Sequence, residues 1–304
     1  MPDATPVHIG AVDLGASSGR IMVGTIADGH LSLTEIRRFS NSVVPVPTSD
    51  GERLFWDVLH LWNEVRQGLL AAVRSVGPLS AIGIDTWAVD YGLVNASGAL
   101  STQVHAYRSA RTQGVPEQVF ARIPAQEVYA INGLQVQDFN TLFQLIAQER
   151  DDGLPREPDG TNTHTLLLLP DLLACFLTGK RIAEVTNAST TGLVDACRRT
   201  WSLPLLKRLR TEIGLDLDDL LPDIIEPGTV IGTVRPEAAD IVGPAGRPTP
   251  VIAVGSHDTA SAVVSVPATD SDFAYISCGT WSLVGLELDE PVLTEASRTA
   301  NFTN

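Results

Sequence analysis

An apolar stretch near the N-terminus is interrupted by a run of small and polar residues. The stretch IGAVDLGASSGRIMVG, from Ile9 to Gly24, predicts two strands joined by a turn at Leu14 to Arg20. Hairpin turns commonly need only two or three such residues, so this longer run needs a reason. Glycine lets a backbone approach a ligand closely, and successive N–H groups can bind phosphate oxygens. For an isolated turn, a flexible solvent-exposed hairpin is the more frequent explanation.

The order of the elements that follow constrains the fold further. Three consecutive strands are expected from Val7 to about Phe39, and apolar residues at helical spacing predict a helix over Trp56 to Val76. Two more strands around a short turn are expected in Leu79 to Val94. The apolar run LLLLPDLLACFL, Leu166 to Leu177, predicts a strand that continues into a buried helix. This alternation of strands and helices indicates an α/β protein.

A stretch rich in proline and glycine near Gly243 to Pro248 predicts a domain boundary. We therefore expect a first domain over residues 1–245 and a second over residues 246–304. The second begins with a strand, a loop and a helix in VIAVGSHDTASAVVSV, followed by a strand, a turn and a strand in FAYISCGTWSLVGLEL. Because an isolated hairpin is marginal in water, we expect this second domain to be incomplete.

Charge and cysteine content narrow the classes of partner and compartment. The chain has 36 acidic and 21 basic side chains, a formal net charge of −15. This balance argues against a nucleic-acid or anionic-membrane partner, which would require a basic face. Its three cysteines are few, odd in number and far apart, which favours a reduced cytoplasm over a disulfide framework or a zinc site. The first residues show no signal-peptide pattern, so we expect a cytoplasmic protein.

The turn at Gly15 has a counterpart near the end of the chain. In AVDLGASSGRIMVG and YISCGTWSLVGLEL, a strand leads to a central glycine, small hydroxyl residues and another strand, with Asp13 in the place of Ser277 and Gly15 in that of Gly279. The match is short, and spacing alone leaves common origin and coincidence equally open. Two such hairpins, one in each domain, would grip a polyphosphate from both sides. Asp13, at a strand end, would hold Mg²⁺ through water.

Several motifs in order resemble those of the FGGY carbohydrate kinases. They are VDLGASSGRIMV, IGIDTWAVDYGLV, AYRSART, FNTLFQL, LLLLPDLLACFLTGK, TNASTTGLVD, VIAVGSHDTASAVVSV and SCGTWSLVG, and they extend over Val7 to Asn304. The resemblance implies the actin-like, ribonuclease-H-like ATPase fold, an α/β fold of two related domains with the active site in the cleft between them. It is strongest to members that use MgATP to phosphorylate L-rhamnulose on its 1-hydroxyl. ATP and Mg²⁺ are therefore the expected cofactors.

The resemblance also implies roles for individual residues. Asp258 is the expected general base, while His257, Thr259 and Ala88 are expected to contact the sugar, and Asp13 to orient Mg²⁺ and ATP through water. The expected ATP-binding residues of the two turns are Ala16, Ser17, Ser18, Gly19, Arg20, Gly279 and Thr280. We expect a helix N-terminus to keep Asp258 ionised, with a pKa near the ordinary aspartate value of about 3.9. From the residues alone, helix capping is the alternative role for Asp258, and a satisfied loop histidine is the alternative for His257.

Two positions depart from the family pattern and leave the sugar open. Ala88 stands where the family has glycine, and Ser109 stands where an aspartate that accepts sugar hydroxyls is expected. Another ketose such as L-fuculose or D-xylulose is therefore an alternative substrate. Trp87 packs either on the sugar or, more simply, in the core. Family members continue past the position of Asn304 with most of the adenosine pocket, so a non-catalytic sugar-binding fragment is a further alternative.

Overall fold

The structure is a computed structural model that describes residues 5–49, 51–156, 161–241, 248–270, 273–279 and 282–304. Thr280, expected in the second phosphate turn, lies outside the described residues. Among the described residues, no helix combines the length and apolar character that crossing a membrane requires.

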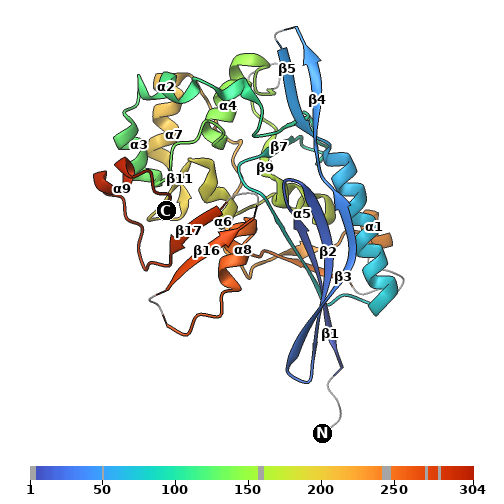
Figure 1. Ribbon diagram of the computed structural model, residues 1–304. Helices are drawn as coiled ribbons and strands as arrows, with labels where there is room; N and C mark the ends of the chain where they lie inside the picture. The colour runs from blue at the N-terminus through green and yellow to red at the C-terminus, as the bar shows by residue number, and fades with distance from the viewer. Residues whose placement is uncertain (1–4, 50, 157–160, 242–247, 271–272, 280–281) are drawn as a thin grey trace.

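A six-stranded sheet organises the molecule, in the order β14-β15-β6-β1-β2-β3 (Figure 1). Its strands are β1 (Val7–Leu14), β2 (Ser18–Ala27), β3 (His30–Ser40), β6 (Ala81–Thr86), β14 (Val230–Thr233) and β15 (Pro250–Ile252). The first three form an antiparallel meander, and β1, β6 and β15 run parallel. The carboxyl ends of the three parallel strands therefore meet at one edge of the sheet. Figure 1 shows the sheet on the right, with α1 along its outer side.

Helix α1 (Val58–Val76) covers the meander because its apolar residues recur at helical spacing. Leu61, Val65 and Leu69 are buried against strands β1 to β3. The Asp57 side chain begins the helix by accepting a hydrogen bond from the His60 N–H at 2.9 Å. Helix α5 (Leu169–Thr178) packs against β6, β14 and β15, and the core cluster extends from α1 through the sheet to α5.

A second core lies among helices that gather on the left of Figure 1, away from α1. These are α2 (Val115–Phe120), α3 (Ala125–Asn132), α4 (Thr141–Asp151), α6 (Val185–Ala188) and α7 (Leu203–Arg208). The small sheets pair β4 (Val43–Thr48) with β5 (Gly51–Trp56) and β5 with β8 (Val104–His105), and pair β7 (Tyr91–Val94) with β9 (Thr165–Leu168). Two-residue strands β10 (Ala183–Glu184) and β13 (Ile224–Ile225), and β11 (Val194–Asp195) and β12 (Thr200–Trp201), pair likewise. The short helical turns are η1 (Ala110–Thr112), η2 (Ser189–Thr191), η3 (Leu209–Ile213) and η4 (Pro236–Ile241).

The last part of the chain contains α8 (Asp258–Val264), the hairpin of β16 (Ala274–Cys278) and β17 (Ser282–Leu286), and α9 (Glu295–Thr299). Strand β15, which the sequence placed at the start of the second domain, pairs with β6 in the first sheet through Val251 and Ile82. An isolated bridge between Thr86 and His257 continues this pairing. Strand β15 and His257 both lie beyond the expected boundary at residues 245 and 246, and that boundary stays a prediction. The β16–β17 hairpin is a separate two-stranded sheet.

Candidate functional site

The site predicted from the sequence lies at the edge where β1, β6 and β15 end. Asp13 of β1 is the direct partner of Asp85 in β6. The Thr86 N–H donates to the Ser256 carbonyl at 2.9 Å, which fixes the segment after β15 beside β6. The Trp87 N–H donates to the Leu14 carbonyl at 3.2 Å, which fixes the first hairpin on the other side. Three segments far apart in sequence are thus joined backbone to backbone.

Three carboxylates gather at this edge. Burial, and the negative charges of Asp13 and Asp258, raise the pKa of Asp85 to about 8. The nearby Arg20 guanidinium acts in the opposite direction and is the weakest of these influences. Sequence reasoning missed Asp85, although the strand IGID ends in an aspartate just as AVD does. The sequence could not show that β1 and β6 pair Asp13 with Asp85. Two apolar strands that each end near an aspartate were nevertheless a signal that the two carboxylates could meet.

Asp258 is the first residue of α8, and His257 precedes the helix without capping it through its side chain. The Asp258 carboxylate accepts a hydrogen bond from the Thr259 N–H at 2.6 Å, and its side chain is 39% exposed. Desolvation raises its pKa above the usual aspartate value, although His257 and Thr259 oppose the shift. The sequence-based expectation of an ordinary pKa was therefore wrong, because it considered the helix N-terminus and not burial.

His257 lies beside this carboxylate, with its Nε2 atom 3.5 Å from Asp258 Oδ1. Burial lowers the pKa of His257 despite the neighbouring negative charges of Asp258 and Glu184. The imidazole is consequently neutral at neutral pH and can both donate and accept hydrogen bonds. Thr259 donates its hydroxyl to Asp258 at 3.3 Å, so it contacts the carboxylate as well as being an expected sugar contact.

The first hairpin is tighter than the sequence suggested. Only residues 15–17 lie outside the strands, because β1 continues to Leu14 and β2 begins at Ser18. Asp13 and Arg20 face each other in the antiparallel ladder and form an ion pair. Gly19 is packed beneath Phe39, and a Cβ atom there would lie 2.4 Å from the ring. Ala16 is also buried, whereas Ser17 is exposed and Ser18 partly so, so their hydroxyls are the accessible ones.

Asn41, which sequence reasoning missed, fixes the tip of this hairpin. Its backbone N–H donates to the Ser17 carbonyl at 3.0 Å, and its side-chain amide donates to the Gly15 carbonyl at 2.9 Å. Asn41 is itself buried. Two carbonyls of the turn are thereby tied to the end of β3, which leaves the turn with a defined shape.

The second hairpin is similar to the first in outline but not in detail. Four residues separate the paired positions Leu14 and Gly19, whereas three separate Cys278 and Ser282. Gly279 is exposed. Within the described ranges, no hydrogen bond or ion pair links Gly279 to residues 13–20. A phosphate grip formed by both hairpins remains a prediction.

The turn after β6 has an unusual backbone. Val89 has a φ of 66°, in the left-handed region that β-branched residues rarely adopt. Its carbonyl accepts a hydrogen bond from the Thr141 hydroxyl at 2.7 Å. Ala88, an expected sugar contact, precedes it and is partly exposed. Strained residues that the surroundings hold in place often lie at functional sites.

A buried carboxylate supports this turn. Asp90 accepts hydrogen bonds from the indole N–H groups of Trp56 at 2.6 Å and Trp87 at 2.9 Å, from the Tyr107 N–H at 3.2 Å and from Gln144 at 3.0 Å. Burial raises the pKa of Asp90 to about 6, and these four donors limit the rise. Trp87 is 5% exposed and packs against Trp56 in a tilted arrangement, with ring centroids 4.4 Å apart. It therefore packs in the core.

Ser109 is also buried, and its Oγ atom has no hydrogen-bond partner among the described residues. It immediately precedes η1, without capping it. An aspartate at this position would be buried in the same way. The structure therefore gives no direct support for a contact between residue 109 and a sugar.

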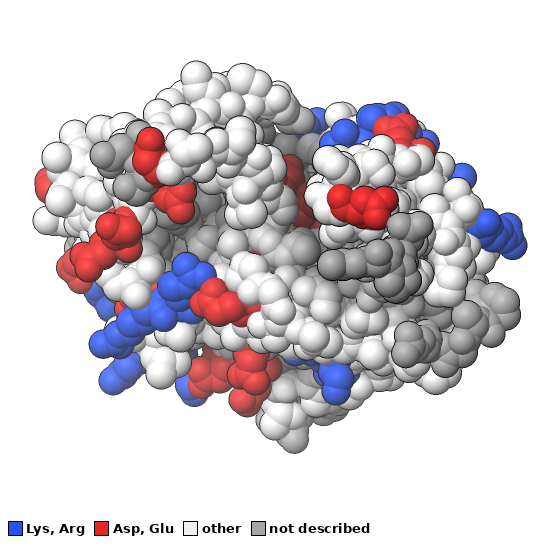
Figure 2. All heavy atoms as spheres, turned by 90° about the horizontal axis from the view of Figure 1, so that it is seen from below, with Lys and Arg blue, Asp and Glu red and all other residues white. Residues whose placement is uncertain are grey.

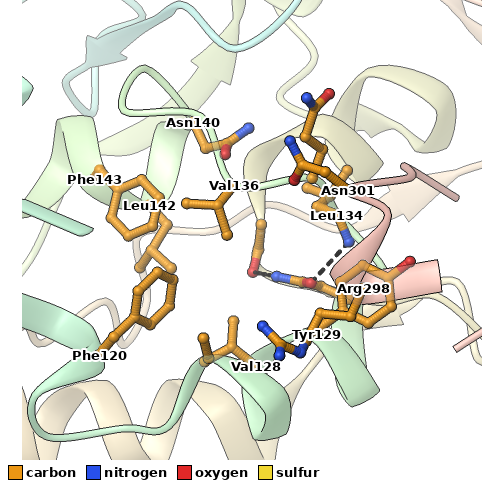
Figure 3. Close-up of a pocket in the computed structure, with 14 residues that line it drawn as sticks. Phe120, Val128, Tyr129, Leu134, Val136, Asn140, Leu142, Phe143, Arg298 and Asn301 are labelled. Atoms are coloured by element: carbon orange, nitrogen blue, oxygen red, sulfur yellow. Dashed lines mark hydrogen bonds between the residues drawn. The ribbon is translucent and has the colours of Figure 1, made fainter. Parts of the chain in front are cut away.

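Seen from below, the surface is hollowed near its middle, and acidic atoms lie inside the hollow (Figure 2). A separate cavity of about 80 Å³ opens between α3, α4 and the segment around α9. Figure 3 shows the rings of Phe120 and Phe143 on one side of it and Arg298 and Asn301 on another. The cavity is mainly apolar, and none of the site residues predicted from the sequence lines it.

Comparisons with known proteins agree on one family. Residues 8–265 match the N-terminal domain of the FGGY family of carbohydrate kinases. The chain is 42% identical over 294 residues to a rhamnulokinase of Bacteroides thetaiotaomicron, covering 97% of this chain and 58% of the relative. It is 37% identical over 296 residues to a rhamnulokinase of Bacillus subtilis, covering 97% of this chain and 57% of the relative. The chain thus spans less than two thirds of these relatives.

Solved structures show the same fold. A gluconate kinase from Lactobacillus acidophilus superposes with a TM-score of 0.80 at 18% identity, over 96% of this chain and 56% of that one. A Plasmodium falciparum glycerol kinase with ADP superposes with a TM-score of 0.65 at 15% identity, over 81% of this chain and 48% of that one. The actin-like fold expected from the sequence is therefore confirmed.

Proposed function

The chain belongs to the FGGY family of carbohydrate kinases, and from that premise we propose that it acts in the ATP-dependent phosphorylation of L-rhamnulose at the 1-hydroxyl. The product is L-rhamnulose 1-phosphate. Identities of 37% and 42% to rhamnulokinases over nearly the whole chain support this substrate. The observation that carries the proposal is the position of Asp258, which follows His257 at the sheet edge where Asp13 and Asp85 are paired.

In this mechanism Asp258 accepts the proton of the sugar 1-hydroxyl as the oxygen attacks the γ-phosphorus of ATP. The transition state of phosphoryl transfer is loose, so the proton leaves late and a carboxylate is a sufficient base. A general base works best when its pKa is near the working pH. The raised pKa of Asp258 moves its basicity in that direction. His257, Thr259 and Ala88 hold the sugar in this proposal.

The nucleotide phosphates would lie against the first hairpin. Arg20 supplies positive charge, Ser17 and Ser18 supply hydroxyls, and Ala16 and Gly19 contribute only backbone, since both side-chain positions are packed. Gly279 and Thr280 are proposed for the opposite side. Closure around the phosphates would exclude water from the transferred group.

The residues of this edge fit a Mg²⁺ ion that is held mainly by the nucleotide phosphates and water, and not one enclosed by protein ligands. No group of three or more metal-ligating side chains that could hold a metal is present among the residues described. Mg²⁺ characteristically keeps several waters and binds through one or two carboxylates plus phosphates, and Asp13 is such a carboxylate, 30% exposed. When bound, Mg²⁺ would neutralise phosphate charge.

The location we propose is the cytoplasm. All three cysteines, Cys175, Cys197 and Cys278, are free thiols in the structure. Reduced thiols are the usual state in that compartment.

The test is a ketose panel with MgATP, measured as ADP release and, separately, as ketose binding by calorimetry. We expect L-rhamnulose to be preferred over L-fuculose and D-xylulose. Asp258→Asn should lower turnover by roughly 10²- to 10⁴-fold while ketose binding is largely retained. Asp218→Asn, which removes an exposed carboxylate paired with Arg210, is the matched control and should leave turnover unchanged.

Two outcomes would contradict the proposal. If Asp258→Asn phosphorylates L-rhamnulose at the parent rate, Asp258 is not the base. If the parent chain binds a ketose but releases no ADP with any member of the panel, this chain is a sugar-binding module without catalysis.

A further inference from the structure

A buried glutamate adjoins the segment that carries Asp258. Glu184, at the end of β10, is 1% exposed. Its Oε2 atom accepts hydrogen bonds from the Ser256 N–H at 3.0 Å and from the Ser256 hydroxyl at 2.7 Å. Its carboxylate also accepts bonds from the Thr186 N–H at 2.9 Å, the Thr186 hydroxyl at 2.6 Å and the Asn187 N–H at 3.3 Å. All five contacting groups are donors, so the Glu184 carboxylate oxygens act only as acceptors here.

The residues that follow Glu184 bind the same segment directly. The His257 N–H donates to the Thr186 hydroxyl oxygen at 3.3 Å, and the Asn187 amide donates to the Ser256 carbonyl at 3.3 Å. That carbonyl also accepts the Thr86 N–H, so the peptide between Ser256 and His257 is held at both its carbonyl and its N–H. The motif TNASTTGLVD, which begins at Thr186, had no assigned role in the sequence analysis.

We propose that Glu184, Thr186 and Asn187 form a clamp that positions His257 and Asp258 for proton transfer from the sugar. The role of the clamp in proton transfer rests on the proposed function. The hydrogen bonds that form the clamp do not depend on any substrate. Glu184 does not touch the reacting atoms in this arrangement. It acts through Ser256, two residues before the base.

Two features distinguish the clamp from ordinary packing. First, a buried carboxylate is costly unless its acceptors are filled, and here every contact that fills them comes from this short motif or from Ser256. Second, a neighbouring carboxyl group is affected by Glu184. Burial, and the Glu184 charge, raise the pKa of Asp171 well above its usual value. Asp171 accepts the Glu184 N–H at 3.2 Å.

Amide hydrogen exchange on the whole chain tests the clamp without substrate. In Glu184→Gln we expect the Ser256 and His257 amides to exchange at least about tenfold faster, because a charged hydrogen bond is lost. In Thr186→Val, which keeps the shape of the side chain, the His257 amide should exchange faster than the Ser256 amide, because His257 loses its acceptor while Ser256 keeps its bond to Glu184. Glu64→Gln is the control, because Glu64 is a buried glutamate bonded to Arg37 outside the site.

The amides of α1 report overall stability in each variant. Faster exchange confined to residues 256 and 257 supports the clamp. The proposal is overturned if exchange in Glu184→Gln rises equally in α1 and in this segment. It is also overturned if exchange in this segment rises as much in Glu64→Gln as in Glu184→Gln. Either result would show that Glu184 only stabilises the fold. If Glu184→Gln does not fold, Thr186→Val decides alone, and parent-like exchange of the His257 amide in it refutes the clamp.

Calorimetry separates this inference from the proposed function. A working clamp should give Thr186→Val an affinity for L-rhamnulose about tenfold weaker than the parent, with nucleotide affinity unchanged. If the parent binds no ketose, the proposed function fails, while the exchange result still decides whether Glu184 and Thr186 hold the segment.

Discussion

Gly19→Ala tests whether the first hairpin needs glycine for phosphate or for packing. A Cβ atom at residue 19 would lie 2.4 Å from Phe39 Cζ and 2.7 Å from Leu14 Cδ2. Overpacking of this kind costs about 1–3 kcal/mol, whereas alanine is about 0.5–1 kcal/mol better than glycine within a strand. We therefore expect a net loss of up to about 2.5 kcal/mol of unfolding free energy, measured by urea denaturation.

Gly24→Ala is the matched control, because Gly24 is in the same strand and its Cβ atom would have no neighbour closer than 3.5 Å. It should be neutral or slightly stabilising. Phe39→Leu removes the ring atoms that clash, so the double variant with Gly19→Ala should lose less than the sum of the two single changes. The packing explanation is refuted if Gly19→Ala keeps parent stability yet loses affinity for an ATP analogue.

Three further changes test the local structure around the site, each by urea denaturation. Val89→Gly should destabilise less than Val89→Ala, because only glycine relieves the left-handed φ of 66°, a strain of about 1–2 kcal/mol; the reverse order would contradict this. Asn41→Ala should cost about 1 kcal/mol and weaken nucleotide binding, and unchanged binding would show that the turn keeps its shape unaided. Folded Asp85 keeps its proton up to about pH 8, so parent stability should fall as pH rises from about 4 to 8, and Asp85→Asn should remove at least about 1 kcal/mol of that fall. A parent-like slope in Asp85→Asn would refute this assignment.

The β1–β3 meander, helix α1 and strands β6 and β7 could be predicted because their apolar residues recur regularly. The β4–β5 hairpin was missed because β4 contains Pro45 and Pro47, and proline in a run argues against a strand. The structure resolves the conflict by placing β4 at the edge of its small sheet, where proline is tolerated. The length of the first turn was overestimated for a related reason. Small residues such as Ser18 and Gly19 look like turn formers but remain paired in β2.

Whether a site residue could be predicted from the sequence depended on how far along the chain its partners lie. Asp13 and Asp258 each belong to a recognisable motif, and the structure brings both motifs to one sheet edge. Glu184 and Asn41 owe their positions to partners 72 and 26 residues away, so no local pattern indicates them. Contacts of this kind come from tertiary packing, which a single sequence does not record.

The three carboxylates at this edge divide their roles by environment. A nucleotide brings more negative charge to the site, so three ionised aspartates would oppose its binding. Burial, and its two neighbours, keep Asp85 protonated at neutral pH, with a pKa of about 8. Arg20 forms an ion pair with Asp13, and burial raises the pKa of Asp258, which makes that carboxylate a stronger base. Unequal environments thus separate a proton-holding aspartate in β6 from an ion-paired aspartate in β1 and from a base at the start of α8. Comparing how the unfolding free energy of the parent and of Asp85→Asn depends on pH measures the contribution of Asp85 to that separation.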